Sequence, residues 1–201
     1  DQEMSRGLGD VYKRQNPLYD NLIGKHATND ACFLRQPGKP TVSFRQFSER
    51  TSQVANLLLK HGLKPGDRVA VQASKTVEMV ILYGATIQAG GVFLSLNTDY
   101  KKDEISYFIK DASPKIFVCD PQKRKELEQI TGQVGSQVLT LDKNGQGSLQ
   151  SQANILSKTF NTIDRRPDDL VALLYTSGTT GRSKGAMLTQ NNLLSNAKTL
   201  K

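Results

Sequence analysis

The sequence predicts an α/β fold built on a mostly parallel sheet with helices on its faces. Short apolar runs typical of strands alternate with longer segments whose apolar residues recur at helical spacing. Glycine, proline and capping residues mark most of the boundaries between these segments. Because such alternation favours βαβ units, the strands are expected to run mostly parallel. A loop rich in glycine, serine and threonine interrupts the pattern near the C-terminal end of the chain.

The first well-marked helix is predicted for residues 44–60. Ser43 and Gln46 have the spacing of a capping box, and Gly62 follows as the expected C-cap. Apolar residues between these two signals recur at helical spacing and predict a buried stripe. A turn at 64–67 then leads into a strand at 69–73.

Helix and strand continue to alternate beyond this strand. Helices are predicted at 77–89, 104–110, 121–130 and 149–158, and strands at 92–96, 116–119, 138–141, 170–175 and 186–189. Asp120 followed by proline is a helix-start signal for the third of these helices. A further helical pattern begins at Asn191, with Leu193, Leu194 and Ala197 on one side.

The polar loop at residues 177–185 has the composition of a phosphate-binding loop. Glycines allow backbone N–H groups to point inward, hydroxyls add further donors, and Lys184 adds a compact positive charge. The loop lies between the apolar runs at 170–175 and 186–189, so it is predicted to connect two strands. Its length and density of hydroxyls and glycines favour a nucleotide cradle over the simpler alternative, a polar surface turn.

A Walker A loop is the nearest alternative for this composition. That motif places lysine directly after its last glycine and continues into a helix. Here Ser183 precedes Lys184, Gly185 follows it, and residues 186–188 are short and apolar. An ordinary P-loop phosphotransferase, which would require a helix beginning at Lys184, is therefore disfavoured.

Residues 175–189 resemble the phosphate-loop signature of the adenylate-forming superfamily, which includes acyl- and aryl-CoA synthetases, luciferases and peptide-synthetase adenylation domains. The resemblance continues through residues 62–71 and 90–97 and covers about residues 16 to 201. It implies the N-terminal part of the large domain of such an enzyme, with the phosphate loop between two strands. Within the superfamily, malonyl-CoA synthetases are the most similar, at residues 96–100, 114–121, 162–165 and 168–170.

This resemblance implies a two-step reaction. A carboxylate attacks the α-phosphorus of ATP to give an acyl-adenylate and pyrophosphate, and the thiolate of CoA then displaces AMP to give a thioester. The implied small-molecule partners are ATP, CoA and a carboxylic acid, with Mg²⁺ as a cofactor. Malonate is expected from the family likeness alone. Another acyl- or aryl-CoA ligase stays open, as does a module that binds nucleotide without chemistry.

The resemblance assigns ATP-phosphate binding to the loop and its two ends. The residues are Thr176, Ser177, Gly178, Thr179, Thr180, Gly181, Lys184 and Gly185. Donors placed here would stabilise the charge that grows on the departing β- and γ-phosphates. Mg²⁺ is expected to bind mainly phosphate oxygens, with the hydroxyl of Thr180 as a further ligand. No catalytic residue is assigned, because the resemblance places the lysine that contacts the reacting carboxylate beyond Lys201, together with the acidic metal ligand and the acyl pocket.

Two positions depart from the commonest pattern of the superfamily. Ser183 stands where proline is usual, which resembles the malonyl-type variant. Gln190 stands where histidine is usual. A glutamine can still form hydrogen bonds, but any role of a titrating imidazole is lost at this position.

Residues 16–201 are interpreted as a truncated N-terminal portion of an AMP-binding domain. Members of the superfamily are much longer, and the last helical pattern stops without a cap or a breaker. Residues 1–15 are interpreted as a non-native or disordered leader, because they lack an apolar period and residues 11–15 resemble translated sequencing-adapter sequence. The truncated chain alone is expected not to adenylate a carboxylate.

Composition argues against several other classes of protein. The formal net charge is +8, but the basic residues are dispersed and the densest run, at 123–125, is followed by Glu126, so no nucleic-acid partner is predicted. Cys32 and Cys119 lack the spacing of metal ligands. No apolar run has the length of a membrane span, and there is no signal peptide. A cytoplasmic enzyme is expected, or a mitochondrial one if the parent is eukaryotic.

The sequence predicts no chemical role for its tyrosine and histidine side chains. Tyr83, Tyr100 and Tyr107 lie in or beside helical patterns, where packing in the core is the commoner use of tyrosine. His26 and His61 have no nearby nucleophile or second ligand in the sequence. The helix C-terminus alone accounts for His61.

Overall fold

A six-stranded sheet forms the centre of the structure, a computed structural model that describes residues 15–176 and 183–200. Its strand order is β6-β5-β3-β4-β7-β8, and every neighbouring pair is parallel except β7 and β8, which are antiparallel. The strands are β3 (Arg68–Gln72), β4 (Val92–Ser95), β5 (Ile116–Cys119), β6 (Gln137–Thr140), β7 (Leu170–Thr176) and β8 (Lys184–Thr189). The predicted mostly parallel sheet is confirmed.

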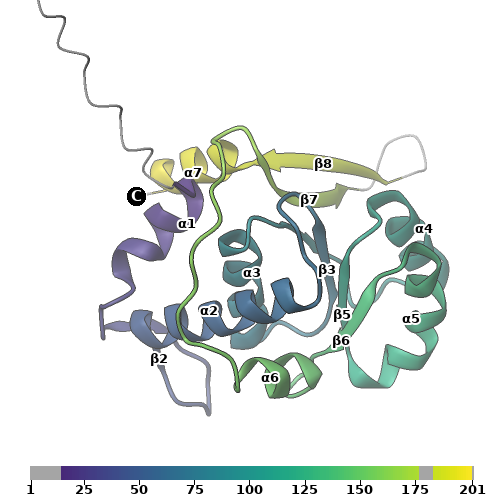
Figure 1. Cartoon of the computed structure of the whole chain (residues 1–201). Coiled ribbons are helices and arrows are strands. Elements are labelled where there is room, and N and C mark those ends of the chain that lie inside the picture. Colours follow the sequence, from purple (N-terminus) through teal and green to yellow (C-terminus); the bar gives the residue numbers. More distant parts are fainter. Residues whose placement is uncertain (1–14, 177–182, 201) are drawn as a thin grey trace, which may run out of the picture.

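Helices cover both faces of this sheet (Figure 1). One face is packed by α1 (Pro17–Leu22), α2 (Phe44–Lys60), α3 (Val77–Gln88), α6 (Ser148–Ala153) and α7 (Gln190–Thr199), and the other by α4 (Lys102–Ala112) and α5 (Arg124–Thr131). Successive strand residues alternate between the two apolar cores: Val69 and Val71 join the first, and Ala70 joins the second. The sheet is therefore buried on both sides, as parallel sheets usually are.

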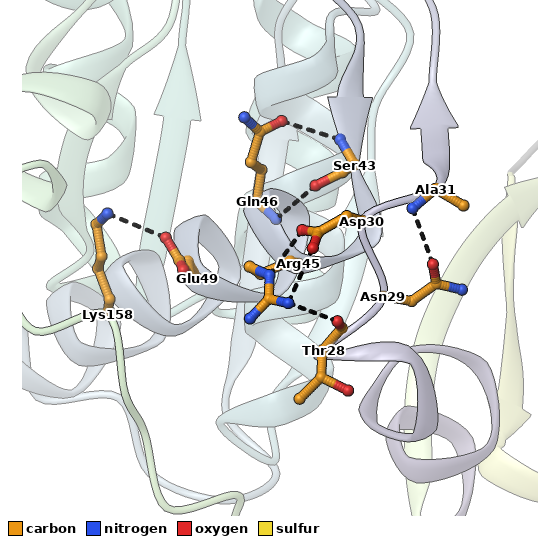
Figure 2. A network of polar contacts seen from close by, with 9 residues as sticks. All are labelled: Thr28, Asn29, Asp30, Ala31, Ser43, Arg45, Gln46, Glu49 and Lys158. Atoms are coloured by element: carbon orange, nitrogen blue, oxygen red, sulfur yellow. Dashed lines mark hydrogen bonds and ion pairs between the residues drawn. The ribbon is translucent and has the colours of Figure 1, made fainter.

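The predicted capping box begins α2. The N–H of Gln46 donates to the hydroxyl of Ser43 at 3.2 Å, and the N–H of Ser43 donates to the side chain of Gln46 at 3.0 Å (Figure 2). In the same turn the guanidinium of Arg45 pairs with Asp30 at 2.7 Å. These contacts join α2 to the chain that precedes it, which contains η1 (Gly24–His26) and the antiparallel pair β1 (Cys32–Leu34) and β2 (Val42–Ser43).

Two helices differ from the sequence prediction. The segment expected as one helix at 121–130 begins with a 3-10 turn, η2 (Pro121–Lys123), which continues into α5, and a second 3-10 turn, η3 (Gly132–Val134), follows α5. The helix expected to reach residue 158 ends at Ala153. Amides on α2 explain the early end, because Gln53 donates to the carbonyls of Asn154 and Leu156 at 3.0 and 3.1 Å. Backbone groups held by side chains in this way are not available for helical bonds.

The chain from 154 to 169 crosses the helices of one face before it enters β7 (Figure 1). Asn56 donates to the carbonyls of Ser157 and Thr159, both at 3.0 Å. The fully buried Asn16 donates to the carbonyl of Ile163 at 3.1 Å and to that of Ile87 at 2.8 Å. Side-chain amides therefore hold this crossover at several points between Asn154 and Ile163.

The contacts by which Gln15 and Asn16 hold the N-terminal segment in place were not predicted from the sequence. The side chain of Asn16 also accepts from the N–H of Tyr19 and so caps α1. Gln15 exchanges two bonds with the crossover: its N–H donates to Asp164 at 2.9 Å, and its carbonyl accepts from Arg165 at 2.8 Å. Residues 1–14 lie outside the described residues, so the leader stays a prediction. Across the part of the chain that is described, none of the helices combines the length and apolar character needed to span a bilayer.

The two cysteines should differ sharply in reactivity. Cys32 is exposed, whereas Cys119 is buried on β5, where burial raises the pKa of its thiol to about 12. Because the thiolate is the reacting species, a thiol reagent at about pH 8 should label Cys32 in the native protein and both cysteines after denaturation. Peptide mass spectrometry measures the labelling. Equal rates at the two thiols in the native state would contradict the burial of β5.

Candidate functional site

The predicted phosphate loop joins the antiparallel strands β7 and β8. Their register runs from Leu170 opposite Thr189 to Thr176 opposite Lys184, so the last paired residues are the two ends of the loop. This arrangement confirms the predicted strand–loop–strand unit. Lys184 begins a strand, not a helix, and this contradicts the P-loop alternative.

The loop leaves the sheet at the carboxyl ends of the parallel strands. Leu94 on β4 pairs with Leu173 on β7, and the same register continued along both chains puts Thr176 about level with Asn97. The segment after β4 is fixed at this edge by the buried Gln72, which donates to the carbonyls of Asn97 and Tyr100 at 2.9 and 3.1 Å. Two ordered chain segments therefore border the edge where open α/β sheets bind their ligands.

Three of the eight predicted phosphate-binding residues lie within the described part of the chain. Thr176, Lys184 and Gly185 are exposed at the ends of the hairpin, and the hydroxyl of Thr176 lies 3.5 Å from the carbonyl of Lys184. The other five lie outside the described residues, and their assignment stays a prediction: Ser177, Gly178, Thr179, Thr180 and Gly181.

Gly185 lies against the aromatic ring of Tyr175. A Cβ atom at this position would lie 3.3 Å from Cε1 of Tyr175, a distance that would force the ring to shift. Glycine therefore allows the tyrosine to lie close to the strand that carries Lys184. The same ring packs on Phe108 of α4, with a distance of 4.4 Å between ring centroids.

Helix α4 contacts the chain at both ends of the loop, where β7 ends and where β8 begins. The hydroxyl of Tyr107 donates to the carbonyl of Ser183 at 3.0 Å, and the hydroxyl of Tyr175 donates to the carboxylate of Asp111. Burial, followed by the hydrogen bond to Asp111, raises the pKa of Tyr175, so the hydroxyl remains a donor at neutral pH. The sequence interpretation assigned Tyr107 to the core and missed this contact. The signal available was the spacing of Tyr107 and Asp111, which share one face of a helix.

The described residues do not build a metal centre of their own. No group of three or more His, Cys, Asp or Glu side chains among residues 15–176 and 183–200 is arranged to hold an ion. Asp111, the carboxylate nearest the hairpin in the contacts above, already accepts from Tyr175. The predicted ligand Thr180 is outside the described residues. Mg²⁺ held mainly by phosphate oxygens stays a prediction.

Gln190, at the position where histidine is usual, has a structural role. It is buried at the start of α7, and its side-chain oxygen accepts from the N–H of Leu18 at 3.0 Å. Leu18 lies in the first turn of α1, where backbone N–H groups have no partner inside the helix. Gln190 supplies that partner and joins the end of β8 to the N-terminal helix.

The fold and this edge define a class of protein: an α/β protein with a phosphate-loop sequence held between an antiparallel pair of strands at the carboxyl edge of its sheet. The chain belongs to the AMP-binding enzyme family, whose model matches residues 24–201. Its sequence is 37% identical over 171 residues to tyrocidine synthase 2 of Brevibacillus parabrevis, a match that covers 85% of this chain and 4% of the synthase.

Solved structures agree with this family. Apo MatB from Rhodopseudomonas palustris superposes with a TM-score of 0.89 at 48% sequence identity, and ATP-bound MatB from the same organism superposes with the same score at 49% identity. Each comparison covers 92% of this chain and 37% of the MatB chain. The chain thus spans little more than a third of the length of these neighbours.

Replacing Gln190 tests its structural role. Gln190→Leu keeps much of the side-chain volume but leaves the N–H of Leu18 buried without its partner, which should lower the free energy of unfolding by about 1–3 kcal/mol. Urea denaturation measures the loss. The control is Asn191→Leu, because Asn191 is exposed at the next position of α7. Similar stability of the two variants would remove Gln190 as an anchor.

Proposed function

We propose that these residues belong to an ATP-dependent acyl-CoA synthetase in which the β7–β8 hairpin holds the phosphates of ATP. The observation that carries this proposal is the register that places Thr176 opposite Lys184 at the carboxyl edge of the sheet. Membership of the AMP-binding family and the similarity to an ATP-bound neighbour at 49% identity support the same ligand.

The described ends of the hairpin offer the donors that a triphosphate needs. The ammonium group of Lys184 is exposed and supplies a point charge, and the hydroxyl of Thr176 lies across the strand pair from it. Gly185 adds a backbone N–H, and the space where its Cβ would lie is taken by the ring of Tyr175. We propose that the hydroxyls and amides of residues 177–181 complete this set.

The proposed reaction places the greatest demand on the loop when pyrophosphate leaves. A carboxylate oxygen forms a bond to the α-phosphorus while the bond to the β-phosphate oxygen breaks, and both electrons of that bond go to pyrophosphate. Fixed donors at the hairpin stabilise this negative charge as it develops. The CoA thiolate then attacks the acyl carbon and displaces AMP. No step is assigned to Mg²⁺, because the described residues do not form a site for it.

Malonate is the proposed acid. The support is the 48% identity to MatB together with the malonyl-type stretches of the sequence, one of which, residues 96–100, is fixed at the carboxyl edge by Gln72. Another acyl- or aryl-CoA ligase of the same family is one alternative, since the chain is also 37% identical to a different member, tyrocidine synthase 2. Medium-chain and aryl acids, and nucleotide binding without chemistry, are the remaining alternatives. Assays of the whole protein that contains this chain, with each acid in turn, decide between them.

Neutralising Lys184 tests the phosphate site in the 201-residue chain. Lys184→Met should weaken ATP binding by about tenfold, because a hydrogen bond to a charged group contributes roughly 1.5–3 kcal/mol when it is well formed. Isothermal titration calorimetry measures the affinity. The matched control is Lys198→Met, which removes the same charge from an exposed position near the end of α7. Equal weakening in both variants would indicate a general charge effect and contradict the assignment.

Replacing the matching segment of R. palustris MatB with this chain tests whether these residues support adenylation. The 48% identity and the TM-score of 0.89 predict a folded chimera. We expect it to catalyse malonate-dependent exchange of pyrophosphate into ATP, and we expect Lys184→Met to reduce the rate by at least about tenfold. The isolated 201-residue chain is the control and should show no exchange. A folded chimera that binds ATP but catalyses no exchange would contradict the proposal, as would robust exchange by the isolated chain.

A further inference from the structure

We propose that helix α4 positions the phosphate hairpin: Tyr107 holds the carbonyl that precedes Lys184, and Asp111 holds the tyrosine that precedes Thr176. We call these contacts the α4 clamp, formed by Tyr107, Asp111, Tyr175 and Ser183. The ligand in this inference rests on the proposed function. The contacts themselves do not depend on it.

The bond from Tyr107 fixes the backbone at the start of β8. Its hydroxyl lies 3.0 Å from the carbonyl oxygen of Ser183. A peptide unit is planar and almost always trans, so the direction of that carbonyl also sets the direction of the N–H of Lys184. One hydroxyl on α4 therefore orients the backbone amide of the residue proposed to bind phosphate.

The pair formed by Tyr175 and Asp111 fixes the other end of the loop. Tyr175 is the residue before Thr176, and its hydroxyl donates to the carboxylate of Asp111. Its ring packs between Phe108 on one side and Gly185 across the hairpin. Tyr107 and Asp111 lie four residues apart on α4, so one face of one helix holds both ends.

The hydroxyl of Tyr107 is not needed for packing. Phe108, which is 2% exposed, already fills the apolar core between α4 and the sheet. Tyr107 is 37% exposed, and a phenylalanine could take the place of its ring without a change in volume. What the hydroxyl adds is a single hydrogen bond, and its acceptor is at the end of the phosphate loop.

Fixing both ends would prepare the loop for its ligand. Orienting a binding group when a ligand arrives costs free energy, and groups that are already oriented at the described ends, such as the N–H of Lys184, avoid that cost. Donors held in place before reaction also stabilise developing charge more effectively than donors that must reorganise. Tyr107 and Asp111 are therefore positioning residues, with no role in the chemistry itself.

The experiment compares Tyr107→Phe with Tyr83→Phe in the 201-residue chain. Tyr83 lies on α3, on the opposite face of the sheet, where its ring packs on Phe93 with 5.0 Å between ring centroids. Its hydroxyl makes none of the hydrogen bonds found within the described residues. We expect Tyr107→Phe to weaken ATP binding by about two- to tenfold, the effect of losing one neutral hydrogen bond. Hydrogen exchange at the amides of residues 183–185 should become several-fold faster. Tyr83→Phe should change neither quantity, and the urea midpoints of the two variants should agree.

The two measurements separate this inference from the proposed function. If the wild-type chain binds ATP and Tyr107→Phe leaves both affinity and exchange unchanged, the clamp is wrong while the phosphate site stands. If the wild-type chain does not bind ATP, the proposed site fails, and exchange at residues 183–185 alone decides the clamp. Tyr175→Phe repeats the test at the other end and should speed exchange near Thr176. Unchanged exchange in both phenylalanine variants overturns the inference.

Discussion

The position of β7 is the constraint on which the rest of the site depends. This strand pairs in parallel with β4 through Phe93 and Leu94, and antiparallel with β8 along most of its length. The first pairing places its carboxyl end at the edge of the sheet proposed to bind the ligand. The second returns the chain at once, so that Lys184 comes back beside Thr176. Without both pairings, the residues that flank the loop would not meet at this edge.

β7 reaches this position by a long crossover that is fixed mainly by amide side chains. The chain leaves β6 at one edge of the sheet and enters β7 beyond β4. Between these strands, Gln53, Asn56 and Asn16 donate to the carbonyls of the crossover. These carbonyls belong to exposed or half-buried residues, and the amide bonds hold an irregular path across the helices of one face. The crossover thus brings the chain to β7 without helix or strand of its own between residues 154 and 169.

The sequence predicted the regular elements well because their signals are local. The strand at 116–119 and the helix at 44–60 agree with β5 and α2, since an apolar run and a capping box each lie within a few residues of the element they define. The short helix α1 was missed although Asn16 followed by Pro17 is a local start signal, because its six residues are too few to show a helical period. Contacts of Asn16 and Gln190 with distant segments complete its support. The contact of Tyr107 with Ser183 joins residues 76 positions apart and leaves no periodic trace. At the site, the sequence predicted the strand–loop–strand unit, whereas the helix that holds it became visible only in the structure.

Because no helix directly follows the loop, other residues around it must supply both the positive charge and the orientation of the donors. In a P-loop, the N-terminus of the following helix orients several N–H groups and adds the favourable end of its dipole. Here β8 follows the loop, and neighbouring strand dipoles largely cancel. In the proposed site, charge would then come from a side chain, that of Lys184, and orientation from contacts outside the hairpin. α4 is suited to the second task because its buried face is fixed by Ile105, Phe108 and Ile109 in the core, while Tyr107 and Asp111 reach the hairpin. In the proposed site, a rigid helix packed beside the strand pair would thus replace the helix that follows the loop in a P-loop.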